Sequence, residues 1–347
     1  MKTIIRRSLL LAFALFGLCF LCACQQGGQA DGKIHITDVL GKEFTFDQPI
    51  SKVVSTHNPT LNHVVVLGNG TSKYLAGFGN KDKADGLYSR ILDDWNELTV
   101  IGSPGNPVNK ETIIKLHPDL ALVPENLSAM AEKDYEGTGV DTFIALPQNE
   151  KLETIPESSA RIAKLFGAEA EERSRTVTDG STKIVEDAYN AVKDVKDKPR
   201  VLFLGSGYKV ATSDMIQTQI IEATGGQNAA AGQFDSGFFA NTDAETIAKI
   251  NPDVIYYANY SKHTKDEIMN DPKLASTNAV KSGKVYEFPC KLEPWDYPTF
   301  STALGIAWSA HTLHPDLYSK DKLYKNCDDF YKLLYNKTFT PEELGLE

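Results

Sequence analysis

Glu111-Thr-Ile-Ile-Lys-Leu-His-Pro-Asp-Leu120 recurs 134 residues further along the chain as Glu245-Thr-Ile-Ala-Lys-Ile-Asn-Pro-Asp-Val254. In both copies an amphipathic segment with helical spacing ends at Pro-Asp, because proline cannot continue a helix. An apolar run follows each time, Leu120–Val123 and Val254–Tyr257, as is typical of a strand buried on both faces. The repeated helix–turn–strand unit predicts two α/β lobes of similar design with a cleft between them.

Further elements extend each copy into a lobe. Lys52–Thr56 and Arg200–Leu204 are the expected first strands of the two lobes, each followed by a loop and a helix. The stretch 157–196 carries apolar residues at helical spacing and few breakers, which favours one or two helices, at least one of them a long rigid connector. An ordinary helical pair packed on one lobe is the alternative. We therefore expect an N-terminal α/β lobe at 34–156, a connecting helical segment at 157–198 and a C-terminal α/β lobe at 199–347.

The N-terminus reads as a targeting segment. A basic start precedes the apolar run Leu9–Leu21, which is short for a membrane span. The following Leu21-Cys-Ala-Cys24 resembles the lipobox of bacterial lipoproteins, in which the cysteine is acylated and becomes the new N-terminus. We expect residues 1–23 to be a lipoprotein signal peptide, Cys24 the lipidated residue and 24–33 a polar tether. The mature protein would then lie outside the cytoplasm, anchored to the cell membrane; an ordinary secretory signal is the alternative.

Charge and cysteine content narrow the class of protein. The chain has a formal net charge of −10, and loss of residues 1–23 removes three cations and no anion, which leaves −13. So acidic a protein is a poor candidate for nucleic-acid binding. Beyond Cys24 only Cys290 and Cys327 remain, and an oxidising compartment would permit a disulfide between them. Their separation is not fixed by the sequence, so the disulfide and two free thiols both stay open.

The ordered segments together resemble the cobalamin/iron-siderophore class (class III) of periplasmic-binding-protein-like ABC-transporter substrate-binding proteins. The similar segments are Thr37–Lys42, Lys52–Ser55, Asn109–Val123, Thr224–Asn228, Ala244–Ile255, Ala279–Tyr286 and Leu313–Asp316. The resemblance implies two Rossmann-like lobes joined by a long rigid helix. It also implies a monomer without an intrinsic cofactor, which captures a small molecule and delivers it to a membrane permease and its ATPase. It does not imply an enzyme.

The resemblance also assigns a docking role to one glutamate on each lobe. The matching positions are Glu111 and Glu245, whose carboxylates would suit arginine forks on the permease. A purely structural role is the alternative. Thr242-Asp-Ala-Glu245 has the pattern of a capping box, whereas Glu111 would gain only a favourable interaction with the helix dipole.

The ligand cleft should be lined by the loops at the carboxyl ends of the strands. The candidates are Thr56, His57, Asn58, Tyr88, Arg90 and Ser103 in the first lobe, and Ser206, Tyr208, Phe238, Phe239, Trp295 and Tyr297 in the second. Aromatic faces would suit a bulky chelate, and the resemblance implies that Phe239 and Trp295 face the ligand. His57 could ligate a metal or donate a hydrogen bond, or do neither, so no metal ligand is assigned.

The positions of the basic residues limit the charge expected of the ligand. Most arginines of the mature chain fall on the connecting segment, and only Arg90 is a plausible cleft cation. This favours a neutral or weakly charged metal chelate, such as a corrinoid or a hydroxamate-type ferric siderophore, with haem as another candidate. A bare metal ion or an oxyanion such as molybdate, bound on the same scaffold, is the alternative. An enzyme is disfavoured, because the sequence lacks a nucleophile elbow and a phosphate-binding glycine loop.

Overall fold

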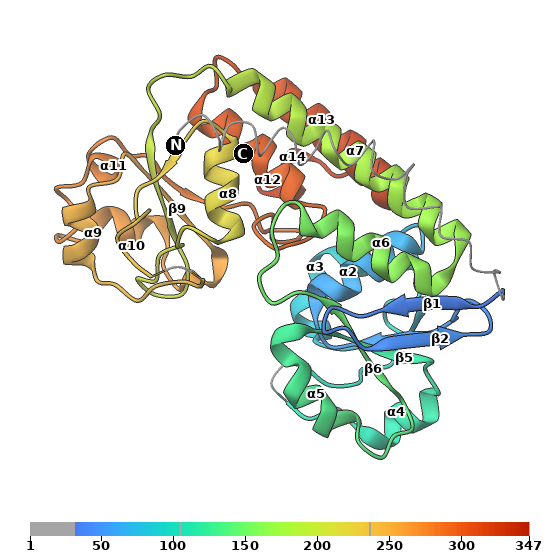
Figure 1. Cartoon of the computed structure of the whole chain (residues 1–347). Helices are drawn as coiled ribbons and strands as arrows, with labels where there is room; N and C mark the ends of the chain where they lie inside the picture. Colours follow the sequence, from blue (N-terminus) through green and yellow to red (C-terminus); the bar gives the residue numbers. More distant parts are fainter. Residues whose placement is uncertain (1–31, 104–105, 236, 347) are drawn as a thin grey trace.

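The computed structural model describes residues 32–103, 106–235 and 237–346. The predicted signal peptide and Cys24 lie outside these residues. Two α/β lobes lie side by side below a long helix (Figure 1). None of the helices in the described ranges has the length and apolar character needed to span a bilayer.

The N-terminal lobe is built on a parallel sheet in the order β4-β3-β5-β6. Its strands are β3 (Val53–Ser55), β4 (Leu75–Phe78), β5 (Leu120–Pro124) and β6 (Thr142–Leu146). Its helices are α2 (Asn58–Leu67), α3 (Lys81–Ile91), α4 (Lys110–Leu116), η1 (Glu125–Leu127) and α5 (Ser128–Tyr135). An antiparallel hairpin of β1 (Ile34–Thr37) and β2 (Glu43–Phe46) packs beside it.

The C-terminal lobe repeats this design with the strand order β10-β9-β7-β8. Its strands are β7 (Arg200–Leu204), β8 (Gln227–Asn228), β9 (Val254–Tyr257) and β10 (Val285–Glu287). Its helices are α8 (Ile216–Ala223), α9 (Ala244–Ile250), η2 (Asn259–Ser261), α10 (Lys265–Asn270) and α11 (Asn278–Lys281). Both sheets are parallel, as expected for strands buried on both faces.

The repeated sequence folds in the same way in both lobes. Asn109 caps α4 by accepting a hydrogen bond from the Thr112 amide, and Asp243 caps α9 by accepting one from the Thr246 amide. Both helices end at a residue in the left-handed conformation, His117 or Asn251.

The caps also change the interpretation of the two glutamates. Because Asp243 is the N-cap residue of α9, the capping box expected from Thr242 to Glu245 does not form. Glu111 and Glu245 occupy the same place, two residues after their cap. Each therefore gains only the dipole interaction of a first-turn carboxylate from its own helix.

The connecting segment consists of two helices, α6 (Thr154–Phe166) and α7 (Ala168–Val192). The 25-residue α7 contacts α2 of the N-terminal lobe as well as α12 (Thr302–Leu313), which packs on α8 of the C-terminal lobe. It is thus the expected long connector, and the helical pair packed on a single lobe is ruled out.

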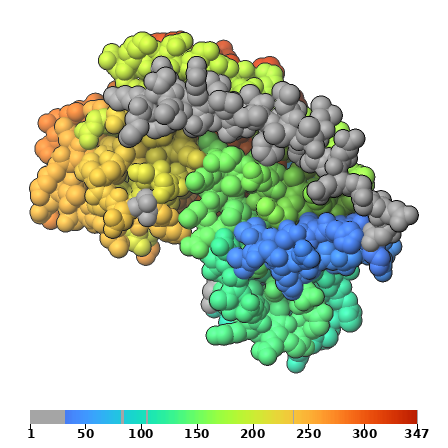
Figure 2. All heavy atoms as spheres, in the orientation of Figure 1, coloured from blue at the N-terminus to red at the C-terminus, as the bar shows by residue number. Residues whose placement is uncertain are grey.

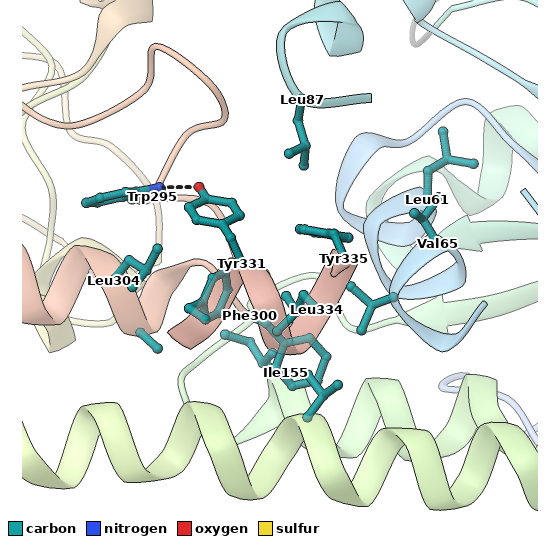
Figure 3. Close-up of a cluster of buried hydrophobic side chains, with 14 of the residues drawn as sticks. Leu61, Val65, Leu87, Ile155, Trp295, Phe300, Leu304, Tyr331, Leu334 and Tyr335 are labelled. Carbon is teal, nitrogen blue, oxygen red and sulfur yellow. Dashed lines mark hydrogen bonds between the residues drawn. The ribbon is translucent and has the colours of Figure 1, made fainter. Parts of the chain in front are cut away.

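The expected C-terminal lobe at 199–347 includes two helices that lie outside its sheet. Helix α13 (Lys320–Tyr335) runs back along α7, and α14 (Pro341–Leu344) follows it (Figure 1). The amide nitrogen of Asn62 donates to the Tyr335 hydroxyl at 3.0 Å, so α13 reaches the N-terminal lobe. Helix α13 therefore packs with α7, and we call these two helices the spine that joins the lobes. Figure 3 shows the result, a cluster of apolar side chains continuous from α2 through α13 to α12.

The disulfide between Cys290 and Cys327 does not form, since both residues are free thiols. Cys327 is buried in α13. The Cys290 sulfur instead lies 3.6 Å from Glu287 Oε1. Stability of the C-terminal region therefore depends on packing and hydrogen bonds.

Arg173 of α7 joins three helices. Its Nη2 donates to the carbonyls of Leu333 at 2.6 Å and Leu334 at 2.8 Å, in the last turn of α13. Its Nε donates to the carbonyl of Val66 at 3.1 Å, in the last turn of α2. These carbonyls have few partners within their own helices and carry the negative end of each helix dipole, which a guanidinium satisfies well.

Replacement of this side chain tests the spine. We expect Arg173→Met to lower the free energy of unfolding by at least about 2 kcal/mol, because several hydrogen bonds to a charged group are lost together. Urea denaturation measures the change. The control is Arg175→Gln on the same helix, whose exposed pair with Glu172 should contribute no more than about 0.5 kcal/mol. Equal effects of the two variants would show that Arg173 has no special role.

Candidate functional site

A hollow of about 580 Å³ lies between the lobes and is lined by both. The outline of the molecule is indented between the two lobes in Figure 2. A second hollow of about 170 Å³ adjoins the first, since His57 and Pro298 line both. The main hollow is lined by His57, Asn58, Pro59, Asn62, Asn80, Leu87 and Tyr88 of the N-terminal lobe and by Asn259, Tyr260, Leu292, Glu293, Pro294, Tyr297, Pro298 and Thr299.

The loop from β3 to α2 supplies much of the N-terminal wall. His57 is the N-cap residue of α2, and its Nδ1 lies 2.9 Å from the Thr60 hydroxyl. Pro59 in the first turn is suited to a helix start, because its fixed φ is helical and its missing N–H would have no partner there. Asn58 and Asn62 are four residues apart, so they share one face of α2. Both line the hollow, beside Tyr88 of α3.

The segments after β9 and β10 supply the opposite wall. The Tyr260 hydroxyl donates to Asp296 Oδ2 at 2.8 Å, and the rings of Tyr260 and Tyr297 lie 6.1 Å apart. Gln217 Nε2 donates to the Asp296 backbone carbonyl at 3.2 Å, which fixes the loop on α8. Glu293 lies in this loop with only 9% of its surface exposed.

Burial controls the charge of the cleft. It raises the pKa of Glu293 to about 7, although the hydroxyls of Tyr331 and Ser301 partly oppose the shift. Burial likewise raises the pKa of Glu150, which lines the smaller hollow, to about 7. It lowers the pKa of His57 to about 4 and that of His63, behind the wall, to about 3. Both imidazoles are therefore neutral at pH 7, and no described lysine or arginine side chain lines either hollow.

The structure brings some of the expected cleft residues together. His57, Asn58, Tyr88 and Tyr297 all line the main hollow. Phe238, 61% exposed, lines the smaller one. These five are the expected residues that line a hollow between the lobes.

Two of the expected cleft residues were placed wrongly. Arg90 pairs with Glu343 through an Nη1 to Oε1 contact of 2.6 Å, so it is committed to α14 and lines neither hollow. Trp295 is 1% exposed and donates from Nε1 to the Tyr331 hydroxyl at 3.1 Å (Figure 3). It is a core residue of the joint between the lobes.

Other expected residues also lie outside the linings of both hollows. They are Thr56, Ser103, Ser206, Tyr208 and Phe239. The Tyr208 hydroxyl donates to Asp271 Oδ2 at 2.5 Å, and its ring lies 4.7 Å from that of His263. Phe239 packs on Gly205, where a Cβ atom would come within 2.7 Å of its ring.

Sequence reasoning missed Asn62, Asn80, Asn259, Tyr260 and Glu293, all of which line the main hollow. Two signals could have found part of this set. Asn62 follows the expected Asn58 by one helical turn, and Asn259 and Tyr260 come directly after an expected strand. No sequence signal distinguishes Glu293 from an exposed loop carboxylate.

The raised pKa of Glu293 has a consequence for stability. In the folded protein the Glu293 carboxyl group keeps its proton up to about pH 7. In an unfolded chain the same group releases the proton near pH 4.5. The free energy of unfolding should therefore fall as pH rises through this window, by up to about 3 kcal/mol. The tyrosines that face the carboxylate, Tyr88, Tyr331 and Tyr335, have raised pKa values and stay neutral there.

We expect Glu293→Gln to melt at a higher temperature than the wild type at pH 8, because a neutral amide has no charge to bury. The difference should shrink towards pH 4.5. Thermal denaturation at both pH values measures it, with exposed Glu132→Gln as the control. A difference that is the same at both pH values would refute the assignment of the proton.

The fold agrees with comparisons against known proteins. Molybdate-binding protein MolA of Haemophilus influenzae is 24% identical over an alignment that covers 97% of this chain and 98% of MolA. Its structure with molybdate bound matches with a TM-score of 0.74 at 21% identity, covering 88% of this chain and 99% of MolA. The Helicobacter pylori CeuE structure, a complex with Ni-His, matches with a TM-score of 0.72 at 20% identity, covering 90% and 98%.

A cobalamin-binding protein of Halobacterium salinarum is 27% identical over 199 residues, 55% of this chain and 52% of that protein. At these identities the solved structures establish similarity of fold alone. A family model described as "Periplasmic binding protein" matches residues 60–292. This match includes both copies of the repeated unit and extends over most of the chain, and the chain therefore belongs to the periplasmic binding protein family.

Proposed function

We propose that this chain is the extracytoplasmic substrate-binding protein of an ABC importer, which captures a metal chelate and delivers it to a permease and its ATPase. The observation that carries the proposal is a hollow of about 580 Å³ lined by both lobes. This volume lies in the range of small-molecule sites. It is far larger than a bare ion needs, and it suits a ferric siderophore, a corrinoid or haem.

The lining supports binding without catalysis. Three tyrosines and three prolines offer apolar faces, and the amides of Asn58, Asn62, Asn80 and Asn259 offer polar contacts. Such a surface orients and covers a bulky guest. His57, with its pKa lowered by burial, is available as a neutral ligand or hydrogen-bond partner.

A receptor for a bare metal ion or for an oxyanion such as molybdate is the second candidate. It is supported by the similarity to MolA, which extends along nearly the whole chain. The lining argues against an oxyanion, because the described side chains around both hollows include no lysine or arginine.

The two repeated glutamates fit the role of docking contacts. Glu111 and Glu245 are exposed at equivalent places, one on each lobe. Lys273 Nζ lies 3.2 Å from Glu245 Oε1, but exposed pairs of this kind are weak and exchange easily. An arginine fork of a permease could therefore replace the lysine. Lipidation at Cys24 would hold the monomer on the membrane beside that permease.

The docking role predicts a separation of binding from delivery. We expect Glu111→Gln/Glu245→Gln to bind ligand with unchanged affinity but to lose the stimulation of ATPase activity by its cognate transporter in proteoliposomes, by about tenfold or more. The matched control is Glu132→Gln/Glu222→Gln, which removes one exposed carboxylate from each lobe elsewhere. Normal stimulation by the docking variant would count against the proposed function.

A further inference from the structure

Three oxygen atoms buried around the main hollow lack a hydrogen-bond partner among the described residues. They are Asn58 Oδ1, Asn62 Oδ1 and Glu293 Oε1. A buried acceptor without a donor is destabilising by about 1–3 kcal/mol, and most such atoms in folded proteins are paired. Three such acceptors around one hollow indicate that the protein itself does not supply the hydrogen-bond donors they need.

The other hydrogen bonds of these residues show which of their polar atoms lack a partner. Asn62 donates from its amide nitrogen to the Tyr335 hydroxyl at 3.0 Å, and its Oδ1 has no partner among the described residues. The hydroxyls of Tyr331 and Ser301 act on the Glu293 carboxylate from the protein side, yet Oε1 remains without a partner. In the adjoining hollow Gln217 repeats the pattern, with Nε2 bonded to Asp296 and Oε1 unpaired.

The charges around the hollow also favour a ligand that donates hydrogen bonds. The carboxyl groups of Glu293 and Glu150 line the two hollows, whereas the described lining has no lysine or arginine. Arg90 is held by Glu343. An acceptor-only oxyanion would meet unpaired oxygens and carboxylates, which is unfavourable.

Resting on the proposed function, we propose that the ligand is a neutral-to-cationic metal chelate whose N–H or O–H groups donate to Asn58, Asn62 and Glu293. A donor placed against each oxygen satisfies all three acceptors on binding. A positive charge on the chelate would also hold Glu293 ionised, and charge-assisted hydrogen bonds are the stronger kind. The same arrangement discriminates against molybdate and citrate-like or catecholate-like chelates.

Calorimetric titration of the mature chain at pH 7.5 and 150 mM NaCl tests this choice with three probes. Hexaamminecobalt(III) is cationic and presents only N–H donors, molybdate presents only acceptors, and cyanocobalamin is neutral with amide donors. We expect the cobalt hexaammine to bind saturably and more tightly than molybdate.

We expect two variants to change the affinity for the cobalt hexaammine in opposite directions. Glu293→Gln should weaken binding of the cobalt hexaammine about tenfold or more, because a charge-assisted bond is lost. Asn58→Asp, which adds a carboxylate at the start of a helix, should tighten it severalfold. The control Glu222→Gln, outside both linings, should change it less than about twofold. Since Glu293→Gln is expected to be more stable than the wild type at this pH, its loss of affinity cannot come from unfolding.

Failure of the inference and failure of the proposed function would give different results. Tighter binding of molybdate than of the cobalt hexaammine, or an unchanged affinity of Glu293→Gln, would overturn the inference and leave a substrate-binding protein with a different ligand. Absence of binding by all three probes would count against the proposed function and, with it, the inference.

Discussion

The hydrogen bonds of Arg173 hold the long helix α7 against α2 of the N-terminal lobe and against α13. This one side chain joins the carboxyl ends of α2 and α13 to the first turns of α7. Because α7 also packs on α12 of the other lobe, the lobes are connected by packed helices and not by a flexible linker. Packed helices resist a change in the angle between the lobes more than a flexible linker would. The hollow between them is therefore largely formed before a ligand arrives, which lowers the entropy that binding must overcome.

The same rigidity explains how polar groups can remain unpaired in the cleft. A mobile wall would let Glu293 turn to water, whereas its neighbours Trp295 and Tyr331 are fixed in the core of the joint (Figure 3). Removing the carboxyl charge of Glu293 should stabilise the ligand-free protein and weaken its binding of the ligand. Stability and binding are thus opposed at this residue, as is common where a site is organised for a guest.

The sequence predicted the fold from local patterns that the structure preserves. The repeat around Glu111 and Glu245 predicted two lobes, and apolar runs predicted their strands, because both depend on short-range periodicity. The site was predicted only in part. Arg90 lies at a plausible loop position, but its partner Glu343 is 253 residues away and pulls it out of the cleft. Trp295 and Glu293 are two residues apart, and only the packing of α13 determines which of them faces the hollow.

If Glu111 and Glu245 dock as proposed, the repeated unit gives a physical reason for one acidic contact on each lobe. In the C-terminal lobe the unit runs from Glu245 through α9 to β9, and the residues directly after β9, Asn259 and Tyr260, line the cleft. In the N-terminal lobe it runs from Glu111 through α4 to β5, whose last residue, Pro124, lines the adjoining hollow. Each carboxylate is therefore connected to its own cleft wall by one helix and one buried strand. A permease that moved the two glutamates apart would move the two walls with them, and the bonds between ligand and cleft would be the first to break.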